Sequence, residues 1–280
     1  IAMLAGQGLL IIVAGYFENH GGIPFAWSAT FLIVAGIFFL LFLYHRFILP
    51  YPITDAQRPG SVSTDFIGEF LKTFGSFFRK EGILLILAFL LLFRINESQL
   101  VKLITPFLLD PRSVGGLGLS TSQVGIAYGT FGVIGLMTGG IIGGIAIAKK
   151  GLRFWLLPMT LIIHIPDLVY ITLSHWQPDN FPLVCGLVGI EQFTYGFGFS
   201  AYMMYMIKAA EGEHKTAHFA ICTGIMAMGM MIPGMIAGEL QELLGYKTFF
   251  ATVLLSIIPA LIIVSLLNID PEFGRKKSAT

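Results

Sequence analysis

The chain has 280 residues, of which 55% are hydrophobic and only 12% are charged, and its formal net charge at pH 7 is +1. Soluble domains carry about 25% charged residues, so this composition excludes an ordinary water-soluble domain and predicts an all-α membrane protein. No segment forms a basic face, and both cysteines, Cys185 and Cys222, lie in apolar segments without metal-ligand spacing. We therefore expect no nucleic-acid partner, no disulfide, no metal and no cofactor.

Eight segments are long and apolar enough to cross a bilayer, which takes about 20 mostly apolar residues. They predict a polytopic protein with eight transmembrane helices. The chain begins at Ile1 inside an apolar stretch, without an initiator methionine or a signal-peptide pattern, so we expect an earlier part to be missing. The predicted spans are 2–18, 24–49, 83–109, 119–148, 153–174, 181–210, 214–243 and 245–269.

One long polar connection, 50–82, separates the second span from the third. Its first part is rich in proline and small polar residues, which is typical of a flexible linker. Its second part, DFIGEFLKTFGSFFRKEG, predicts an amphipathic helix lying on the membrane surface. The phenylalanines at helical spacing are Phe66, Phe70, Phe74 and Phe77, and the basic residues expected to face lipid phosphates are Lys72, Arg79 and Lys80.

The basic residues predict the orientation of the chain. Lysine and arginine accumulate in the cytoplasmic loops of membrane proteins. The opposite loops carry only Arg112 and Lys247, so the side with thirteen basic residues is predicted to be cytoplasmic, together with both chain ends. These thirteen are Arg46, Arg58, Lys72, Arg79, Lys80, Lys149, Lys150, Arg153, Lys208, Lys215, Arg275, Lys276 and Lys277.

The third span contains the most ionisable side chains. At 100° per residue, Arg94, Glu97 and Ser98 share one helix face, with Lys102 at its edge. Ionisable residues in mid-membrane are costly and usually face protein or a water-filled cavity. We expect these residues to line a substrate cavity. The alternative is that Arg94 and Glu97, three residues apart, form a purely structural ion pair.

Glycines at intervals of four predict close packing of the fourth span. Gly135, Gly139 and Gly143 form the first set. A second set lies among methionines in the seventh span: Gly224, Gly229, Gly234 and Gly238. Glycines among methionines would let helices slide, so a mobile interface is one interpretation of this set and plain tight packing is the other.

The sixth span carries a carboxylate near mid-membrane. Glu191, Tyr195 and Tyr202 fall on one stripe of the helix, and Gln192 follows Glu191 directly. Aromatic faces beside hydroxyl and carboxylate groups suit sugar rings, which have apolar faces and many hydroxyls. We expect these four residues to contribute to a substrate and proton-coupling site, and the alternative is a stripe that packs against a neighbouring helix.

The segment GIAIAKKGLR at 144–153 is similar to the G-x-x-x-D-K/R-x-G-x-K/R signature of the major facilitator superfamily. In that family the signature lies on the cytoplasmic side, between the second and third helices of each bundle. Ala148 stands in place of the aspartate, which weakens the family's charge-relay role for this loop. The matching residues are Gly144, Lys149, Gly151 and Arg153.

The superfamily resemblance implies two six-helix bundles joined by a cytoplasmic linker, with the first four helices absent here. Residues 1–49 would be the last two helices of the N-terminal bundle, 50–82 the linker and 83–280 the C-terminal bundle and tail. The third and sixth spans would be the helices that line the central cavity. The fifth would be peripheral, so we interpret its pair, His164 and Asp167, as structural.

The chain also resembles the AmpG-type permeases, which import muropeptides recovered from the cell wall. The resemblance is clearest in IAMLAGQGLLIIVAGYFENHGGIPFAW, GLGLSTSQVGIAYGTFGVIGLMTGGIIGG and IEQFTYGFGFSAYMMYMIKAAEGEHKTAHFAICTGIMAMG. It implies a monomeric, multi-pass protein of the bacterial inner membrane, with a cytoplasmic C-terminus. It also implies a secondary active transporter that imports anhydro-muropeptides of the GlcNAc-anhydro-MurNAc type by proton-coupled alternating access.

On this hypothesis Glu97 or Glu191 is the proton-coupling carboxylate, Arg94 holds a substrate carboxylate, and Tyr195 and Tyr202 stack on sugar. The same fold with another cargo (a sugar, an acetyl-CoA-like molecule or a siderophore) is the first alternative. A polytopic membrane transferase is a distant one, because such enzymes place acids or histidines at the membrane surface rather than at mid-depth.

Overall fold

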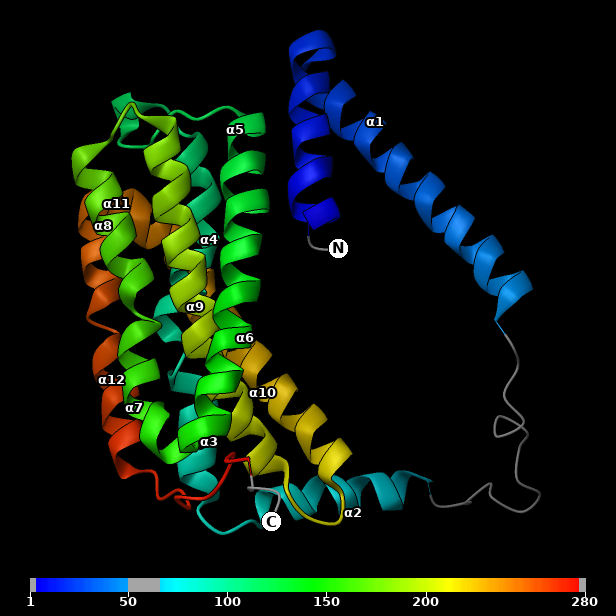
Figure 1. Ribbon diagram of the computed structural model, residues 1–280, viewed down its shortest axis with the longest axis vertical. Helices are drawn as coiled ribbons and strands as arrows, with labels where there is room; N and C mark the ends of the chain where they lie inside the picture. The colour runs from blue at the N-terminus through cyan, green and yellow to red at the C-terminus, as the bar shows by residue number, and fades with distance from the viewer. Residues whose placement is uncertain (1–3, 50–65, 277–280) are drawn as a thin grey trace.

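The computed structural model describes residues 4–49 and 66–276, and every regular element within these ranges is a helix (Figure 1). The predicted linker at 50–65, the first two residues of the predicted first span and Lys277 of the tail lie outside the described residues. Six helical segments in the described part are long and apolar enough to cross a membrane. The chain is therefore an all-α, multi-pass membrane protein.

Short irregular helices interrupt several of the long ones. The elements in chain order are η1 (Leu4–Leu9, a π-helix), α1 (Leu10–Ile48), α2 (Phe66–Phe78), α3 (Ile83–Leu92), α4 (Ile95–Leu109), η3 (Arg112–Val114, a 3-10 helix), α5 (Thr121–Ile126), η4 (Ala127–Gly132, a π-helix), α6 (Val133–Lys150), α7 (Leu152–Ile162), α8 (Ile165–Trp176), α9 (Phe181–Ala210), α10 (Lys215–Met235), α11 (Ala237–Leu254) and α12 (Ile257–Leu266).

Two glycines change the direction of the chain inside elements that are otherwise continuous. Gly22 within α1 has φ 77° and ψ 173°, and Gly245 within α11 has φ 69° and ψ 162°. A left-handed φ of this kind favours glycine, because glycine has no Cβ to clash with the backbone. Figure 1 shows the result in α1, whose two arms meet at the top and diverge downwards.

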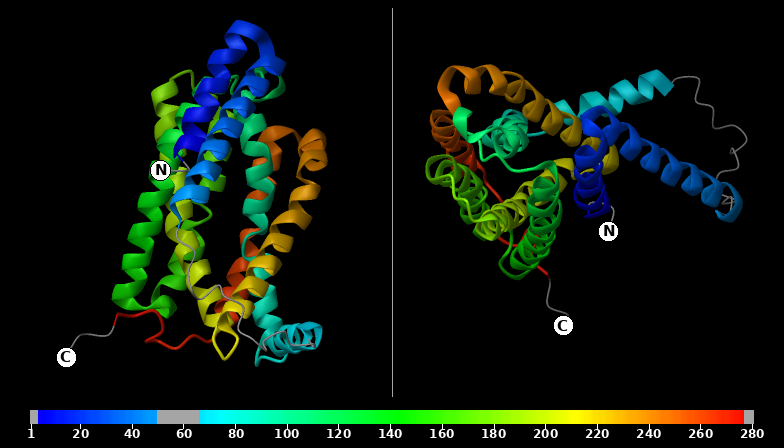
Figure 2. Two further views of the ribbon diagram at one scale, coloured as in Figure 1. Left: turned by 90° about the vertical axis from the view of Figure 1, so that its right-hand side faces the viewer. Right: turned by 90° about the horizontal axis from the view of Figure 1, so that it is seen from above.

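The helices from α3 to α12 form one bundle with two hydrophobic cores (Figures 1 and 2). In the orientation of Figure 1, α3, α7 and α12 lie low in the bundle, and α4, α8 and α11 lie high. The lower core includes Phe89, Phe93, Met159 and Tyr202. The upper core includes Leu100, Phe107, Tyr170 and Phe249.

The polar interior of the bundle falls between these two cores. Along the α3–α4 segment, buried polar residues separate Phe93 of the lower core from Leu100 of the upper core. They are Arg94, Asn96, Glu97 and Ser98. Along α9, buried Glu191, Gln192 and Thr194 hold the equivalent place. The same helices thus supply apolar side chains to both cores and polar side chains to the layer between them.

Two spanning segments are broken where they pass this polar layer. Arg94 interrupts the α3–α4 segment with φ −111° and ψ 20°, and His164 interrupts the α7–α8 segment with φ −93° and ψ −1°. Pro166 follows His164 at the start of α8, where a missing N–H does not weaken the helix. Broken helices at membrane depth are tolerated where protein or a cavity surrounds the freed backbone groups.

The predicted small-residue stripe is the contact surface between α6 and α9. A Cβ added to Gly135 would lie 2.4 Å from the carbonyl oxygen of Gly189, and one added to Gly139 would lie 2.0 Å from that of Phe193. Gly143 approaches Phe197 in the same way. The prediction of close packing is confirmed, and for these three glycines tight packing is what the structure shows.

The second glycine set is divided. Gly229 and Gly234 pack α10 against the backbone of α3 and α4, at Leu91 and Ser98. For Gly224 and Gly238, no described atom lies within 4 Å of an added Cβ. Close approach is therefore confirmed for only half of this set.

The basic turns gather at one end of the bundle. The α6–α7 turn, the α9–α10 turn, α2 and the C-terminal segment all lie at the bottom of Figure 1. There the Lys80 ammonium donates to the carbonyl oxygens of Ala209 (2.7 Å) and Glu211 (2.6 Å), at the C-terminus of α9. A lysine in this position satisfies free carbonyl groups and complements the helix dipole.

The helix α2 crosses this end of the bundle, and one predicted lipid-facing residue is placed differently. Phe70, Phe74 and Phe78 are exposed along one face, as an amphipathic surface helix requires. Phe77 is instead fully buried against the bundle, with its ring 5.5 Å from that of His218 on α10. The side chain of Phe66 lies outside the described part.

The inclusion of Phe77 in the lipid face was therefore wrong. The cause is the 3.6-residue period, which continues the stripe from Phe74 to Phe78 and leaves Phe77 on the side that packs. The hydroxyl of neighbouring Ser76 lies 2.9 Å from Nε2 of His218 and fixes the same contact.

Candidate functional site

A cavity of about 380 Å³ opens in the polar layer between the two cores. Pockets for small molecules usually have about 300–1,000 Å³ and combine an apolar wall with a few convergent polar groups. Here both requirements are met by residues from several helices. The lining residues are Arg94, Asn96, Glu97, Leu100, Val101, Ile104, Tyr128, Leu136, Ile163, Pro166, Glu191, Gln192, Tyr195 and Met230.

The Arg94–Glu97 pair forms one side of the cavity. Nε of Arg94 donates to one carboxylate oxygen of Glu97 at 2.5 Å, and Nη2 donates to the other oxygen. Nη2 also donates to the hydroxyl of Tyr195 on α9, at 2.9 Å. The pair is bidentate and buried, so it combines a strong charge-assisted contact with a fixed geometry. The break at Arg94 places this side chain at the first turn of α4, three residues before Glu97.

Aromatic rings hold the plane of the Arg94 guanidinium. Its central carbon lies 4.7 Å from the centre of the Phe199 ring and 5.6 Å from that of the Tyr202 ring. Tyr202 is fully buried, and its hydroxyl donates to the carbonyl oxygen of Leu90 at 2.9 Å. The structure thus places Tyr202 behind Arg94, as a supporting ring rather than as part of the cavity wall.

Glu191 also lines the cavity and has different partners. Its carboxylate accepts from Nε2 of Gln192 at 2.8 Å and from the hydroxyl of Tyr170 at 3.3 Å. Gln192 also donates to the hydroxyl of Tyr128 at 2.8 Å. Among the described residues, none that hydrogen-bonds to Glu191 carries a positive charge, although Glu191 is only 2% exposed.

The remaining predicted residues are more scattered. Ser98 is buried, and its hydroxyl donates to the carbonyl oxygen of Ile95 on the same helix. Lys102 is exposed, and its stem lies beside Gly234 of α10. Neither residue is among those that line the cavity. The structure therefore brings together Arg94, Glu97, Glu191, Gln192 and Tyr195.

The predicted signature loop lies at the charged end of the bundle, away from the cavity. Lys149, Arg153 and Gly144 are exposed. Gly151 has φ 82°, and a Cβ there would lie 2.6 Å from the carbonyl oxygen of Pro271. The C-terminal segment also bonds to this turn, because Leu152 N–H donates to the carbonyl oxygen of Phe273 at 2.9 Å. The requirement for glycine at 151 is therefore both conformational and steric.

Three residues of the candidate site were not identified from the sequence. Tyr128 lies on the π-helix η4, and such helices are frequent at functional sites. Its only sequence signal is an aromatic residue within a glycine-rich run. Asn96 was hidden between two charged residues, and Tyr170 is brought to Glu191 only by the packing of α8 on α9.

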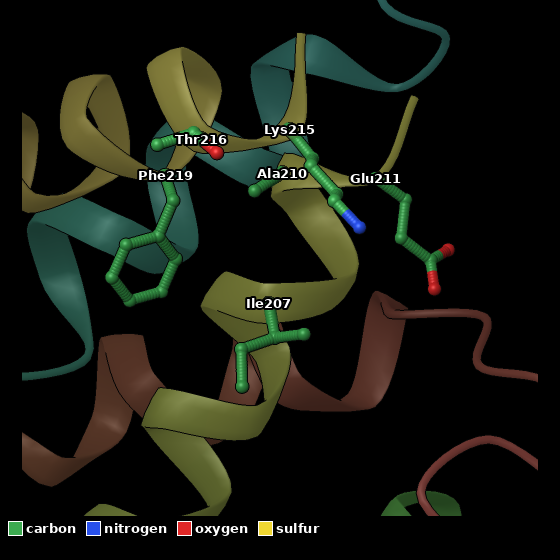
Figure 3. Close-up of a pocket in the computed structure, with 6 residues that line it drawn as sticks. All are labelled: Ile207, Ala210, Glu211, Lys215, Thr216 and Phe219. Carbon is green, nitrogen blue, oxygen red and sulfur yellow. The ribbon is translucent and has the colours of Figure 1, made fainter. Parts of the chain in front are cut away.

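A second pocket, of about 460 Å³, lies at the α9–α10 turn (Figure 3). Figure 3 shows the Glu211 and Lys215 side chains beside a hollow lined by Ile207 and Phe219. Both charged side chains are exposed, so this is a surface hollow without buried polar groups to recognise a solute. The cavity at Arg94 and Glu191 is the better candidate. In the described ranges, no group of three or more His, Cys, Asp and Glu residues could hold a metal ion.

No family model matches the sequence. Three curated proteins of the genus Rickettsia, each with the name "Putative transporter AmpG" and a number, are similar to it. AmpG 2 of Rickettsia prowazekii is 30% identical over 218 residues, which is 78% of this chain and 51% of that protein. AmpG 4 of Rickettsia conorii is 24% identical over 263 residues, or 93% and 61%. AmpG 1 of Rickettsia bellii is 25% identical over 270 residues, or 91% and 63%.

The chain thus spans between about half and three-fifths of the length of these three relatives. Their names describe transporters and not enzymes.

Proposed function

We propose that this chain, a homologue of the AmpG-type transporters, acts within a secondary active transporter that imports anhydro-muropeptides together with protons. The observation that carries this proposal is a cavity in the membrane interior whose three charged side chains are Arg94, Glu97 and Glu191. The transporter names of the relatives support the activity. The cargo and the proton are inferred from the chemistry of the cavity.

The proposed architecture is the major facilitator fold. The six apolar segments become eight spans when the reversal at Gly22 divides Leu10–Ile48 into two and the 30-residue helix α9 is added. The reversal at Gly245 marks the boundary between the last two spans. On this proposal 1–49 are the last two helices of the N-terminal bundle, 50–82 are the linker and 83–280 are the C-terminal bundle. The protein is a monomer of the bacterial inner membrane with its basic end and C-terminus in the cytoplasm.

Glu191 is the proposed proton carrier. Arg94 and Glu97 neutralise each other, which leaves Glu191 as the cavity carboxylate without a described counter-charge. An uncompensated carboxylate in an apolar interior is costly, so the site favours the protonated acid when it is closed to water. Tyr170 and Gln192 donate to the ionised form when the cavity opens. Glu191 therefore gains and loses a proton as its surroundings change.

Arg94 is the proposed anchor for a carboxylate of the cargo. Glu97 now occupies both donor positions of the guanidinium fork. A substrate carboxylate, such as the lactyl or stem-peptide carboxylate of a muropeptide, binds Arg94 only when Glu97 releases it. Release is easiest when Glu97 takes up a proton, and this exchange links proton binding to substrate binding at a second carboxylate.

The aromatic wall of the cavity suits a sugar. Tyr128 and Tyr195 both line the cavity, and each offers a ring face and a hydroxyl. An acetyl-CoA-like cargo fits less well, because phosphates would need several cations and Arg94 is the one cation among the described lining residues. A neutral sugar or a siderophore as cargo is distinguished from a muropeptide by the transport assay.

The test is uptake by the full-length protein in proteoliposomes with an inward proton gradient. We expect accumulation of GlcNAc-anhydro-MurNAc in the wild type. In Glu191→Gln we expect a loss of at least about tenfold in accumulation, while exchange of internal for external solute persists, because exchange needs no net proton movement. Glu239→Gln, an exposed glutamate on α11, is the matched control and should transport normally.

The possible results of this assay test the cargo and the proton carrier separately. If folded protein takes up no muropeptide, the cargo proposal is wrong. If Glu191→Gln accumulates substrate as well as the control does, Glu191 is not the proton carrier, and the same measurement on Glu97→Gln tests the second carboxylate.

A further inference from the structure

A second buried pair of an acid and a base lies beside the cavity and takes no part in the mechanism above. Nδ1 of His164 is 3.1 Å from Oδ2 of Asp167, and their side chains are 2% and 0% exposed. His164 lies at the break between α7 and α8, and Asp167 lies in the first turn of α8. This arrangement repeats that of Arg94 and Glu97 on a different broken helix: a basic residue at the break and an acid three residues later.

Asn96 connects the two breaks. Its Nδ2 lies 3.2 Å and 3.4 Å from the two carboxylate oxygens of Asp167. Asn96 itself lines the cavity and lies between Arg94 and Glu97 on the chain. Asn96 therefore joins the Arg94–Glu97 turn to Asp167 by a direct side-chain contact.

The donors around Asp167 favour its ionised form. The Nδ2 group of Asn96 and the Nδ1 group of His164 both point at the carboxylate, and hydrogen bonds to a charged group stabilise that charge. A buried negative charge also requires a positive partner, and His164 is the residue in contact that can supply it.

The other ionisable groups near the pair do not provide this compensation. From α4 and α9, the carboxylates that face Asp167 are those of Glu97 and Glu191, which repel it. α12 has no ionisable residue. Within the described residues, the ionisable side chains of α6 and α11 do not face the pair either. Tyr246 bonds to Asp110, and the others are exposed at the surface: Lys149, Lys150, Glu239, Glu242 and Lys247.

The outer nitrogen of His164 is a second sign of an unusual site. Nε2 is buried and has no hydrogen-bond partner among the described residues. Unpartnered polar atoms in a protein interior are rare, because they lose water without gaining a new bond. Among the described residues, the contact with Asp167 is therefore the one hydrogen bond of this imidazole.

We propose that the His164–Asp167 pair is a proton-binding site distinct from the cavity carboxylates, occupied by one proton on His164 and linked to the cavity through Asn96. With the proton, the pair is neutral overall and ties the α7–α8 break to the first turn of α4. Without it, Asp167 joins Glu191 as a second carboxylate without a counter-charge near the cavity, and this tie weakens. The site itself is independent of the proposed function, whereas its coupling to transport rests on that function.

The charge state of His164 can be observed directly by nitrogen NMR of ¹⁵N-histidine-labelled, full-length protein in lipid nanodiscs. The described chain has six histidines, and His164→Gln identifies the signal. We expect both His164 nitrogens to carry hydrogen at pH 7. In Asp167→Asn the ratio of charged to neutral imidazole should fall about tenfold or more, because the stabilising negative charge is removed. His175, which is exposed, serves as the internal control and should not change.

Two further variants complete the test. Introducing Glu97→Gln into the wild type should shift the His164 signal. The same substitution should shift it less in an Asn96→Ala background, because the link through Asn96 is cut. If His164→Gln does not fold, the signal is assigned by replacing the other histidines one at a time. A neutral His164 at pH 7, or a spectrum unchanged by Asp167→Asn, would overturn the proposal.

Uptake assays separate this proposal from the function. A protein that transports no muropeptide but shows a charged, Asp167-dependent His164 retains the proton site and loses the proposed cargo. Normal muropeptide uptake with a neutral His164 retains the cargo and overturns the proton site.

Discussion

Arg94 and Glu97 satisfy each other inside the membrane, and this mutual dependence governs what their replacement does. The side chains are 9% and 8% exposed, so neither can be hydrated if its partner is removed. An ion pair of this kind is weak evidence for stability as a whole, but breaking it from one side leaves a buried charge. The spacing of three residues showed that the two side chains could pair, and the sequence analysis gave the pair as the alternative to a cavity-lining role.

We therefore expect Arg94→Ala to lower the free energy of unfolding by about 3–5 kcal/mol. The double variant Arg94→Ala with Glu97→Gln should recover part of this loss, because it removes the uncompensated charge. Unfolding by denaturant in mixed micelles provides the measurement. A double variant as unstable as the single one would show that lost packing against Phe199, and not charge, is responsible.

At the scale of the helix, α6 carries glycines with different surroundings at positions 139 and 144. Gly139 meets the backbone of α9, whereas no described atom lies within 4 Å of a Cβ added at Gly144. In both cases alanine has the better helix propensity, by about 0.5–1 kcal/mol. Only the contact with α9 distinguishes them.

Gly139→Ala should therefore destabilise the protein by about 1–3 kcal/mol, as overpacking does, since a Cβ would lie 2.0 Å from the carbonyl oxygen of Phe193. Gly144→Ala on the same helix should be neutral or slightly stabilising. Thermal denaturation followed by size-exclusion chromatography compares the two. Equal melting temperatures would mean that α6 and α9 move apart to accept the added methyl group without a loss of stability.

The turn between α6 and α7 offers a second test at this scale. Gly151 and Gly82 both have left-handed φ values, 82° and 68°, but only at Gly151 would a described atom lie close to an added Cβ. Gly151→Ala should displace the C-terminal segment and expose it to limited proteolysis after Pro271. Gly82→Ala bears the backbone cost alone, so its tail should be cleaved at the wild-type rate. Faster cleavage in both variants would indicate that backbone strain is enough.

For the whole molecule, the distribution of charge is the feature that defines its two ends. The basic turns, α2 and the C-terminal segment lie together at one end, as the sequence predicted for a common side of the membrane. Ser113 and Lys149 are exposed at opposite ends of the bundle, within η3 and at the end of α6. These positions permit a direct test of orientation.

In a protein with Cys185 and Cys222 replaced by alanine, we expect Ser113→Cys to react with an impermeant thiol reagent added to intact cells. Lys149→Cys should react only after the membrane is permeabilised, because basic loops stay in the cytoplasm. Both native cysteines are buried, so their replacement should be tolerated. The reverse pattern of labelling would contradict the proposed orientation.

How far the sequence could be interpreted differs among these scales. The membrane class and the close-packed glycines of α6 follow from hydropathy and spacing along one helix. The role of Phe77 was misassigned, because a stripe of phenylalanines does not show which member meets another helix. Nor did the sequence indicate that Tyr202 stands behind Arg94, where its hydroxyl is bonded to Leu90.

The sequence by itself determined that the chain lies in a membrane, which end carries the positive charge, and that Arg94 and Glu97 are spaced closely enough to pair. These properties are local, since apolar length, loop charge and a spacing of three residues act within a single segment. Only the tertiary structure decided that Tyr128 and Tyr170 reach the Glu191–Gln192 pair and that Asn96 reaches Asp167. Those contacts join residues on different helices, and their formation depends on how broken helices pack around a polar layer, which no spacing along one chain segment encodes.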